Sequence, residues 1–178
     1  IRGCTALKTL EIQSGVTKIE DHVFDVGENS VLEKLTLGFG ISEIVTYSLD
    51  NDGYHFPNLT EVVLPSSLKK VGAYAFNGAG IETLTVGFVN GAVTTEAFRG
   101  LNKLNTLNII SGPVGKYCFD GLTSLETVNI GEGVTSIGEA AFANCTGLTT
   151  VNFAGGAASI DSYVFDGCTA LKEVNLAE

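Results

Sequence analysis

Apolar residues recur along the chain in a three-part pattern with a fixed order. In the clearest copy, an L-x-x-V-x-I group spans 125–130, a V-x-x-I group spans 134–137, and an Ala-rich group with a central Phe spans 139–144. The first group occurs eight times, at intervals of 21 to 27 residues, and a period of this length indicates a solenoid of stacked repeats. The eight groups begin at Leu7, Leu32, Leu59, Ile81, Leu104, Leu125, Leu148 and Leu171.

Each group predicts one element of the repeat. The first alternates apolar and polar positions, so it predicts a short strand, and strands from successive repeats would form one parallel sheet over a continuous core. The second group, seen at 16–19, 68–71 and 134–137, predicts another extended segment. The third predicts one or two helical turns that insert a Phe into the core from the far side. The Phe residues at this phase are Phe24, Phe76, Phe98, Phe119, Phe142 and Phe165.

Composition supports a folded repeat protein with many turns. The chain has 178 residues, of which 22 are glycine and 44% are hydrophobic, and its mean hydropathy is +0.27. That much apolar material can fill a long core, which a disordered chain could not do. We expect a single elongated domain over residues 1–178, with about seven repeats. Because the opening sequence at 3–7 is identical to that at 167–171, we also expect the chain to be a fragment of a longer protein.

The run VTSIGEAAFANCTGLTTV at 134–151 resembles the BspA-type leucine-rich repeat, whose pattern is V-T-S-I-G-x-x-A-F-x-x-C-x-x-L. The resemblance extends over essentially the whole chain and is strongest in the last three repeats. Between Leu32 and Leu59 the expected Phe and Cys are missing and residues are inserted. The resemblance implies a β-rich α/β solenoid, a right-handed superhelix with a parallel concave sheet. It also implies surface or secreted proteins of bacteria and some protists, associated with adhesion and protein binding.

Charge narrows the range of partners. Twenty acidic and ten basic residues give a net charge of −10, and the basic residues are scattered apart from Lys69 and Lys70. Nucleic-acid binding is not expected, because a polyanion requires a basic stripe that releases counterions. The excess of acidic residues either keeps the protein soluble or complements the charge of a cationic partner. No apolar run reaches the length of a transmembrane helix.

The cysteines and histidines form no metal-ligand or catalytic pattern. Cys4, Cys145 and Cys168 share one repeat phase, and Cys118 occupies a core phase. We expect buried free thiols, since an unpaired Cys behaves as a small hydrophobe. A disulfide between Cys145 and Cys168, which would be neighbours in adjacent turns, stays open as an alternative. Common hydrolase, nucleotide-binding and zinc motifs are missing, so the sequence predicts no enzyme, no cofactor and no metal site.

Two regions are candidate binding surfaces. The polar residues that flank each central strand anchor should point out of the sheet, and in the regular repeats they are Thr106, Thr127 and Thr150 in one row and Asn108, Asn129 and Asn152 in the other. These rows alternatively serve only to stabilise the sheet, because stacked Asn side chains hydrogen-bond to one another. The second candidate is the aromatic-rich insertion with Tyr47, Tyr54, His55 and Phe56, although Phe56 alternatively replaces the missing core Phe.

These observations lead to two hypotheses of function. The first is a non-catalytic recognition or adhesion module, located extracellularly or on the cell surface, that binds a protein or glycan ligand on another cell or host surface. The second is a structural spacer or assembly module that projects another domain. Fold alone does not decide between them, because function depends on the site that the fold carries.

Overall fold

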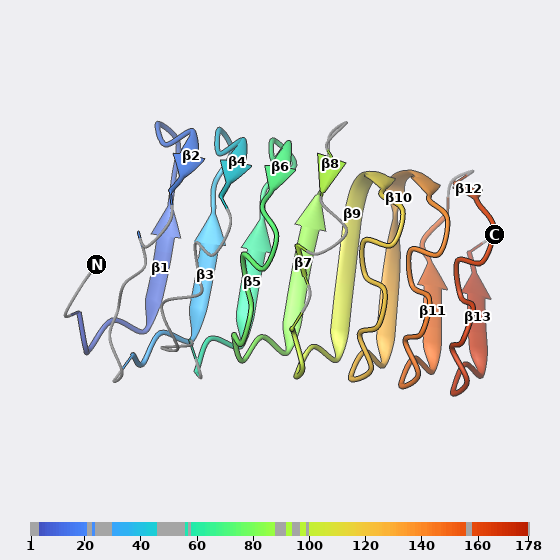
Figure 1. Ribbon diagram of the computed structural model, residues 1–178. Coiled ribbons are helices and arrows are strands. Elements are labelled where there is room, and N and C mark those ends of the chain that lie inside the picture. Colours follow the sequence, from blue (N-terminus) through green and yellow to red (C-terminus); the bar gives the residue numbers. More distant parts are fainter. Residues whose placement is uncertain are drawn as a thin grey trace.

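The chain folds into a β-solenoid whose strands stack side by side along one axis (Figure 1). The computed structural model describes residues 4–20, 23, 30–45, 56, 58–87, 92–93, 97–98, 100–155 and 158–177. The first group of every repeat forms a strand of one parallel sheet, and the strands follow chain order across it. They are β1 (Thr9–Ile12), β3 (Lys34–Leu37), β5 (Glu61–Leu64), β7 (Thr83–Gly87), β9 (Thr106–Val114), β10 (Thr127–Ile137), β11 (Thr150–Phe153) and β13 (Glu173–Leu176).

The register of this sheet pairs equivalent residues of successive repeats. Thr127 lies opposite Thr150, and Val128 lies opposite Val151. In the central strands, partly exposed and buried residues alternate, so that one face covers the core and the other meets solvent. The parallel sheet is therefore as predicted, and so are the residues that face the core and those that face solvent. The alternation specifies this register, because a shift of one residue would expose the whole apolar set.

The second group of each repeat forms the predicted second extended segment. Four of these segments form a separate parallel sheet: β2 (Lys18–Ile19), β4 (Glu43–Ile44), β6 (Lys70–Val71) and β8 (Ala92–Val93). In the next two repeats the chain stays extended around the corner, so β9 and β10 contribute to both positions, and β12 (Ser159–Ile160) pairs with the end of β10. Register shifts on both sides of Gly133 accommodate this bend.

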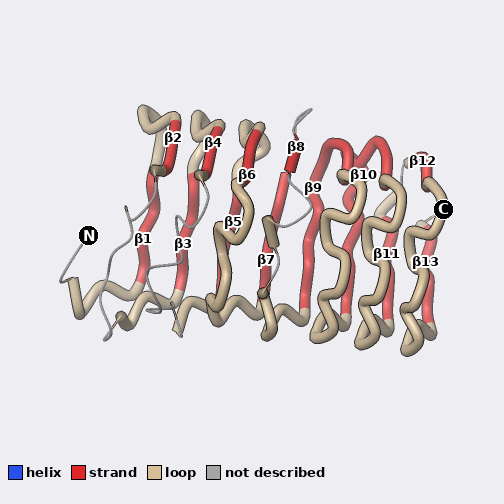
Figure 2. The backbone as a smooth tube through the Cα atoms, viewed as in Figure 1, coloured by secondary structure: helices blue, strands red, loops and turns tan. Residues whose placement is uncertain are grey.

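The helical turns predicted for the third group are not present, and that prediction is wrong. Among the residues that the structure describes, the third segments consist of consecutive turns and contain no helix (Figure 2). The reason lies in the backbone hydrogen bonds. Alternate amides bond to the next repeat, as when the N–H groups of Tyr117, Phe119 and Gly121 donate to the carbonyls of residues 139, 141 and 143, at 2.8 to 3.0 Å. A helix would direct all of these amides along its own axis.

Left-handed backbone conformations also interrupt any helix in the third segment. The residue two positions before the buried Phe has a positive φ in four turns, and so does the residue two positions after it in five turns. A right-handed helix cannot continue through such residues. The first set is Tyr74, Tyr117, Ala140 and Tyr163, with φ between 52° and 60°, and the second is Gly78, Gly100, Gly121, Asn144 and Gly167.

A column of stacked phenylalanine rings runs through the core. The centroids of neighbouring rings lie 5.0 to 5.8 Å apart, and the ring planes are within 18° of parallel. Offset stacking of this kind adds about 0.5–1.5 kcal/mol per pair to the burial of the rings. The predicted position of these rings in the core is confirmed for Phe76, Phe98, Phe119 and Phe142, while Phe165 is partly buried and packs against the core. Phe24 lies outside the described residues.

Candidate functional site

At the start of β7, β9, β10 and β11, the two outward positions of each strand carry only threonine or asparagine, and these side chains are partly exposed. Earlier repeats differ, since Lys34 and Glu61 form an ion pair of 2.6 Å at the equivalent place on β3 and β5. The sheet therefore has an uncharged region in its later repeats, called here the Thr/Asn face. It consists of Thr83, Thr85, Thr106, Asn108, Thr127, Asn129, Thr150 and Asn152.

The asparagines of this face are joined in a ladder. The amide nitrogen of Asn152 donates to the side-chain oxygen of Asn129 at 2.8 Å, and Asn129 donates in the same direction to Asn108 at 2.7 Å. Asn175 extends the ladder beyond Asn152 at 2.8 Å, and Asn108 in turn donates to the hydroxyl of Thr85 at 3.4 Å. An amide group has two N–H donors and two lone pairs, so each ladder residue keeps hydrogen-bonding capacity beyond these contacts.

A groove of about 720 Å³ lies over the ends of these strands, where β9 and β10 bend. Its polar wall consists of Asn108, Asn129 and Asn152, and its apolar wall includes Ile110 and Phe153. Ile110 is 54% exposed, an unusual degree for so large an aliphatic side chain. The groove thus combines a row of aligned amides with an apolar surface, which is the composition typical of ligand sites.

Gly131 and Gly133 allow β10 to approach β9 closely at the bend that borders the groove. A Cβ atom at Gly131 would lie 2.7 Å from the carbonyl oxygen of Ile110 and 2.9 Å from that of Ile109. A Cβ atom at Gly133 would be similarly close to Ser111. The only side chain between these two glycines is that of Glu132, which also lines the groove.

The sequence indicated the polar wall of the groove but missed the apolar one. The structure places the six predicted residues, Thr106, Thr127, Thr150, Asn108, Asn129 and Asn152, together on one face. Ile110 was detectable, because two consecutive isoleucines at 109–110 break the strand alternation and one of them must face outward. Phe153 occupies the inward position that ends the strand group beginning at Leu148; it packs against the core but stays partly exposed.

Of the four candidate residues in the aromatic insertion, the structure describes only Phe56. Phe56 is fully buried, and its carbonyl accepts hydrogen bonds from the amides of Leu59 and Gly80. It therefore belongs to the core, as the alternative interpretation of the sequence held, and cannot form part of a contact surface. The other predicted residues of this insertion, Tyr47, Tyr54 and His55, lie outside the described residues.

Comparison with known protein families shows to which family the chain belongs. The sequence pattern of the BspA type leucine rich repeat region matches residues 2–105 and 92–178, in six copies. The chain belongs to the BspA-type leucine-rich repeat family. No curated protein shows significant similarity to it.

The solved structures similar to this BspA-type chain include three bacterial leucine-rich repeat proteins. They include a leucine-rich repeat protein from Bacteroides ovatus (19% identity, TM-score 0.40) and one from Eubacterium ventriosum (14%, TM-score 0.34). A leucine rich cell surface protein from Faecalibacterium prausnitzii has 14% identity and a TM-score of 0.30. The matches cover 99%, 94% and 97% of this chain, and the chain spans 62%, 65% and 79% of those proteins, respectively.

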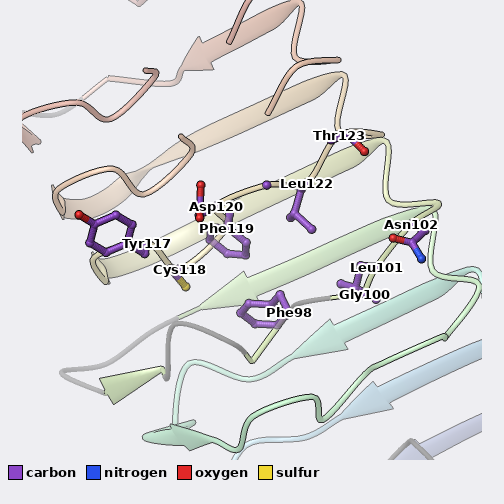
Figure 3. Close-up of a pocket in the computed structure, with 11 residues that line it drawn as sticks. Phe98, Gly100, Leu101, Asn102, Tyr117, Cys118, Phe119, Asp120, Leu122 and Thr123 are labelled. Atoms are coloured by element: carbon purple, nitrogen blue, oxygen red, sulfur yellow. The ribbon is translucent and has the colours of Figure 1, made fainter. Parts of the chain in front are cut away.

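A second cavity of the BspA-type solenoid lies among its turns and has a volume of about 430 Å³ (Figure 3). It lies between the turns that contain Phe98 and Phe119, and Asn102, Asp120 and Thr123 contribute polar groups to its lining. Its thiol, Cys118, is fully buried, and burial raises the pKa of this thiol from 9.0 to about 12. A thiol with such a pKa is not a nucleophile at neutral pH, so the cavity has no activated cysteine.

The cysteines of the BspA-type repeat phase are free thiols in the structure. The Sγ atoms of Cys145 and Cys168 lie 3.2 and 3.1 Å from the carbonyl oxygens of Phe119 and Phe142, respectively, to which they donate. Burial raises the pKa of Cys145 to about 12 and also raises that of Cys168. The structure thus favours free thiols over the disulfide. The predicted burial is confirmed for Cys118 and Cys145 but is wrong for Cys4, which is exposed, and Cys168 is only partly buried.

Exposed ion pairs connect neighbouring BspA-type repeats. Lys70 and Glu43 are 2.7 Å apart, and this hydrogen bond lowers the pKa of the Glu43 carboxyl. Lys116 and Glu139 are 2.9 Å apart, which raises the pKa of the Lys116 ammonium. The paired lysines are not available to a polyanion as free cations. Lys8 with Glu33 and Lys34 with Glu61 also connect neighbouring repeats, whereas Lys18 and Glu20 pair within one repeat.

Among the residues of the BspA-type chain that the structure describes, no group of three or more His, Cys, Asp or Glu residues could hold a metal ion. The same residues include no helix long and apolar enough to cross a membrane.

Proposed function

We propose that this chain is a non-catalytic recognition module that binds a protein or glycan ligand outside the cell through its Thr/Asn face. The groove over β9–β11 carries the proposal, because it combines an exposed Ile110 with amide groups held in one orientation. Membership of a family that is often surface-associated and involved in binding supports an extracellular or cell-surface location.

The chemistry of the two cavities supports a role without catalysis. The groove is lined by neutral side chains apart from Glu132, and the turn-side cavity contains a thiol that stays protonated at neutral pH. General acid–base catalysis requires a group that titrates near the working pH and lies within reach of the substrate. Apart from Glu132, the groove offers amides, hydroxyls and hydrocarbon, and the described lining of the turn-side cavity has a single carboxylate, that of Asp120.

A binding screen with matched variants tests the proposal. Ile110→Lys places a charge on the apolar wall, and Ile160→Lys makes the same change on β12, where the side chain is similarly exposed at 52%. We expect the unmodified chain to bind at least one partner in arrays of extracellular proteins and glycans. Ile110→Lys should weaken that binding at least tenfold and Ile160→Lys less than twofold. Equal effects of the two variants would refute the groove as the site.

The spacer function is the second candidate. It is favoured by the asparagine ladder itself, whose bonds stabilise the stacked strands with no ligand present. Failure of the chain to bind any protein or glycan in the arrays, together with unchanged stability of Ile110→Lys, would support the spacer and contradict recognition.

A further inference from the structure

We infer that the ligand of the Thr/Asn face is a neutral glycan, lying across β7, β9, β10 and β11 along the direction in which the strands stack. This inference rests on the proposed function and specifies its ligand class. The charge pattern, the spacing of the polar groups and the apolar wall of the groove each support it.

The lack of charge on the Thr/Asn face points to a neutral, hydroxyl-rich ligand. All eight residues of this face are Thr or Asn, in a chain with 20 acidic residues, and the groove beside it is lined by one charged residue, Glu132. Hydroxyl and amide groups both donate and accept hydrogen bonds, as sugar hydroxyls do, so the two surfaces match in chemistry. A polyanion would need a basic stripe, and a protein partner would favour aromatic or arginine anchors that these positions do not provide.

The spacing of the polar groups suits a chain of sugars. Equivalent side chains repeat at the strand separation of about 4.8 Å, so the four strands span roughly 14 Å from first to last. Each sugar of an extended glycan advances by a comparable distance, so successive sugars would meet successive repeats. The ladder from Asn175 to Thr85 holds the amides in one orientation, which reduces the entropy lost when the ligand binds.

The apolar wall completes the match. Sugars have hydrocarbon faces as well as hydroxyl edges, and they pack these faces on exposed apolar side chains. Ile110 and Phe153 provide such a surface beside the amides of Asn129 and Asn152. The same glycan chain can therefore direct its hydroxyls to the ladder and its C–H groups to the wall.

Calorimetric titration with defined oligosaccharides tests this inference. The probes are cellohexaose, mannohexaose and N-acetylchitohexaose as neutral chains, with the hexamer of galacturonic acid as the anionic comparison. We expect at least one neutral hexamer to bind and the anionic one not to bind. For the neutral chain that binds, affinity should rise from disaccharide to tetrasaccharide and then level off, because four strands form the face. Equal binding of the anionic hexamer would overturn the inference.

Asn129→Asp and Asn102→Asp separate an effect at the face from a change in net charge. The carboxylate introduced by Asn129→Asp could not donate to Asn108 and would add a negative charge to the groove beyond that of Glu132, so we expect glycan affinity to fall at least tenfold. Asn102 is exposed in a turn outside the groove, and its variant should retain affinity within twofold. Equal losses would overturn the inference. If Asn129→Asp does not fold, judged by circular dichroism, Ile110→Lys replaces it with the same expected loss.

The outcome also distinguishes this inference from the broader proposal. Binding of a protein partner that Ile110→Lys abolishes, without binding of any neutral glycan, would refute the glycan and leave recognition by the groove intact. If no ligand of any class binds, both are refuted.

Discussion

Phe142 shows how a single residue stabilises several repeats. Its ring is fully buried and stacks on Phe119 at 5.5 Å and on Phe165 at 5.7 Å, so it contacts the repeats on both sides. Its removal would leave a cavity that stacked backbones, held by hydrogen bonds between repeats, cannot easily close. The burial of this residue therefore stabilises the stack as well as its own turn.

We expect Phe142→Ala to lower the free energy of unfolding by about 3–5 kcal/mol, through lost burial and the cavity left behind. Phe39 is the matched control, because its ring is 75% exposed and its truncation should change stability by less than about 0.5 kcal/mol. Urea unfolding followed by circular dichroism measures both. A loss below about 1 kcal/mol for Phe142→Ala would contradict the role of the stack.

The buried thiols make stability depend on pH in the alkaline range. The pKa values of Cys118 and Cys145 rise from 9.0 to about 12 on folding. Between these values the unfolded chain releases thiol protons that the folded chain keeps, so the free energy of unfolding falls as pH rises from 9 toward 12. Below pH 9 the thiols are protonated in both states, and this contribution to stability is fully present.

Urea unfolding at pH 8 and pH 10.5 should show this fall, and Cys118→Ala should make it shallower. Alanine is a suitable replacement, because Ala75, Ala97 and Ala141 occupy the same phase in other turns and are fully buried. An identical pH dependence in the variant and the original chain would contradict the assignment to Cys118.

At the scale of elements, the sheet could be predicted and the third segment could not. Strand alternation specifies which face is buried, so the sequence alone indicated the register of all eight first strands. The run EAAFAN at 139–144 has good helix formers, but six residues are too few for a helix to form without tertiary support. In this fold the neighbouring repeats instead accept alternate amides, and no local pattern reveals that.

The candidate site could be predicted only in part, for a similar reason. The outward direction of Asn108 and Asn129 follows from the strand period, but the groove depends on the close approach of β10 to β9 at the bend. Gly131 permits this approach, but in the sequence alone a glycine at this position could equally have indicated an ordinary turn. Only the distances between repeats reveal the steric reason for it.

Two glycines of the fold should respond differently to substitution. Gly131→Ala would bring a Cβ within 2.7 Å of the Ile110 carbonyl, so the strands must separate, at a cost of about 1–3 kcal/mol. Gly121 has a φ of 75°, but a Cβ there meets nothing within 4 Å. Asn144 occupies the same phase with a φ of 57°, so Gly121→Asn should cost less than about 0.5 kcal/mol. Thermal unfolding compares them, and equal destabilisation would contradict the steric role of Gly131.

At the scale of the whole molecule, the solenoid is nearly one-dimensional. Its strands pair only with equivalent strands of adjacent repeats, and the asparagine ladder and phenylalanine stack follow the same order. The exposed ion pairs between repeats contribute little, because solvent screens them. Stability should therefore vary along the axis as a sum of terms from individual repeats and their interfaces.

Hydrogen exchange measures this variation directly. In this chain β9 and β10 are the longest strands and are paired on both sides, whereas β1 and β13 form the two ends of the main sheet and Leu176 is 72% exposed. We expect the slowest amide exchange in β9 and β10 and the fastest in β1 and β13, because opening at an end breaks only one interface.

Hydrogen exchange of the Phe142→Ala variant tests how far along the solenoid the stabilities of the repeats are coupled. Removal of the ring weakens the interfaces with the turns of Phe119 and Phe165, so amides between 115 and 166 should lose the most protection from exchange. Amides of β3 and β5, several repeats away, should lose less, because they open without disturbing those interfaces. Phe39→Ala serves as the control for nonspecific changes. A uniform loss of protection along the chain would show that the solenoid opens as one cooperative unit, contrary to this expectation.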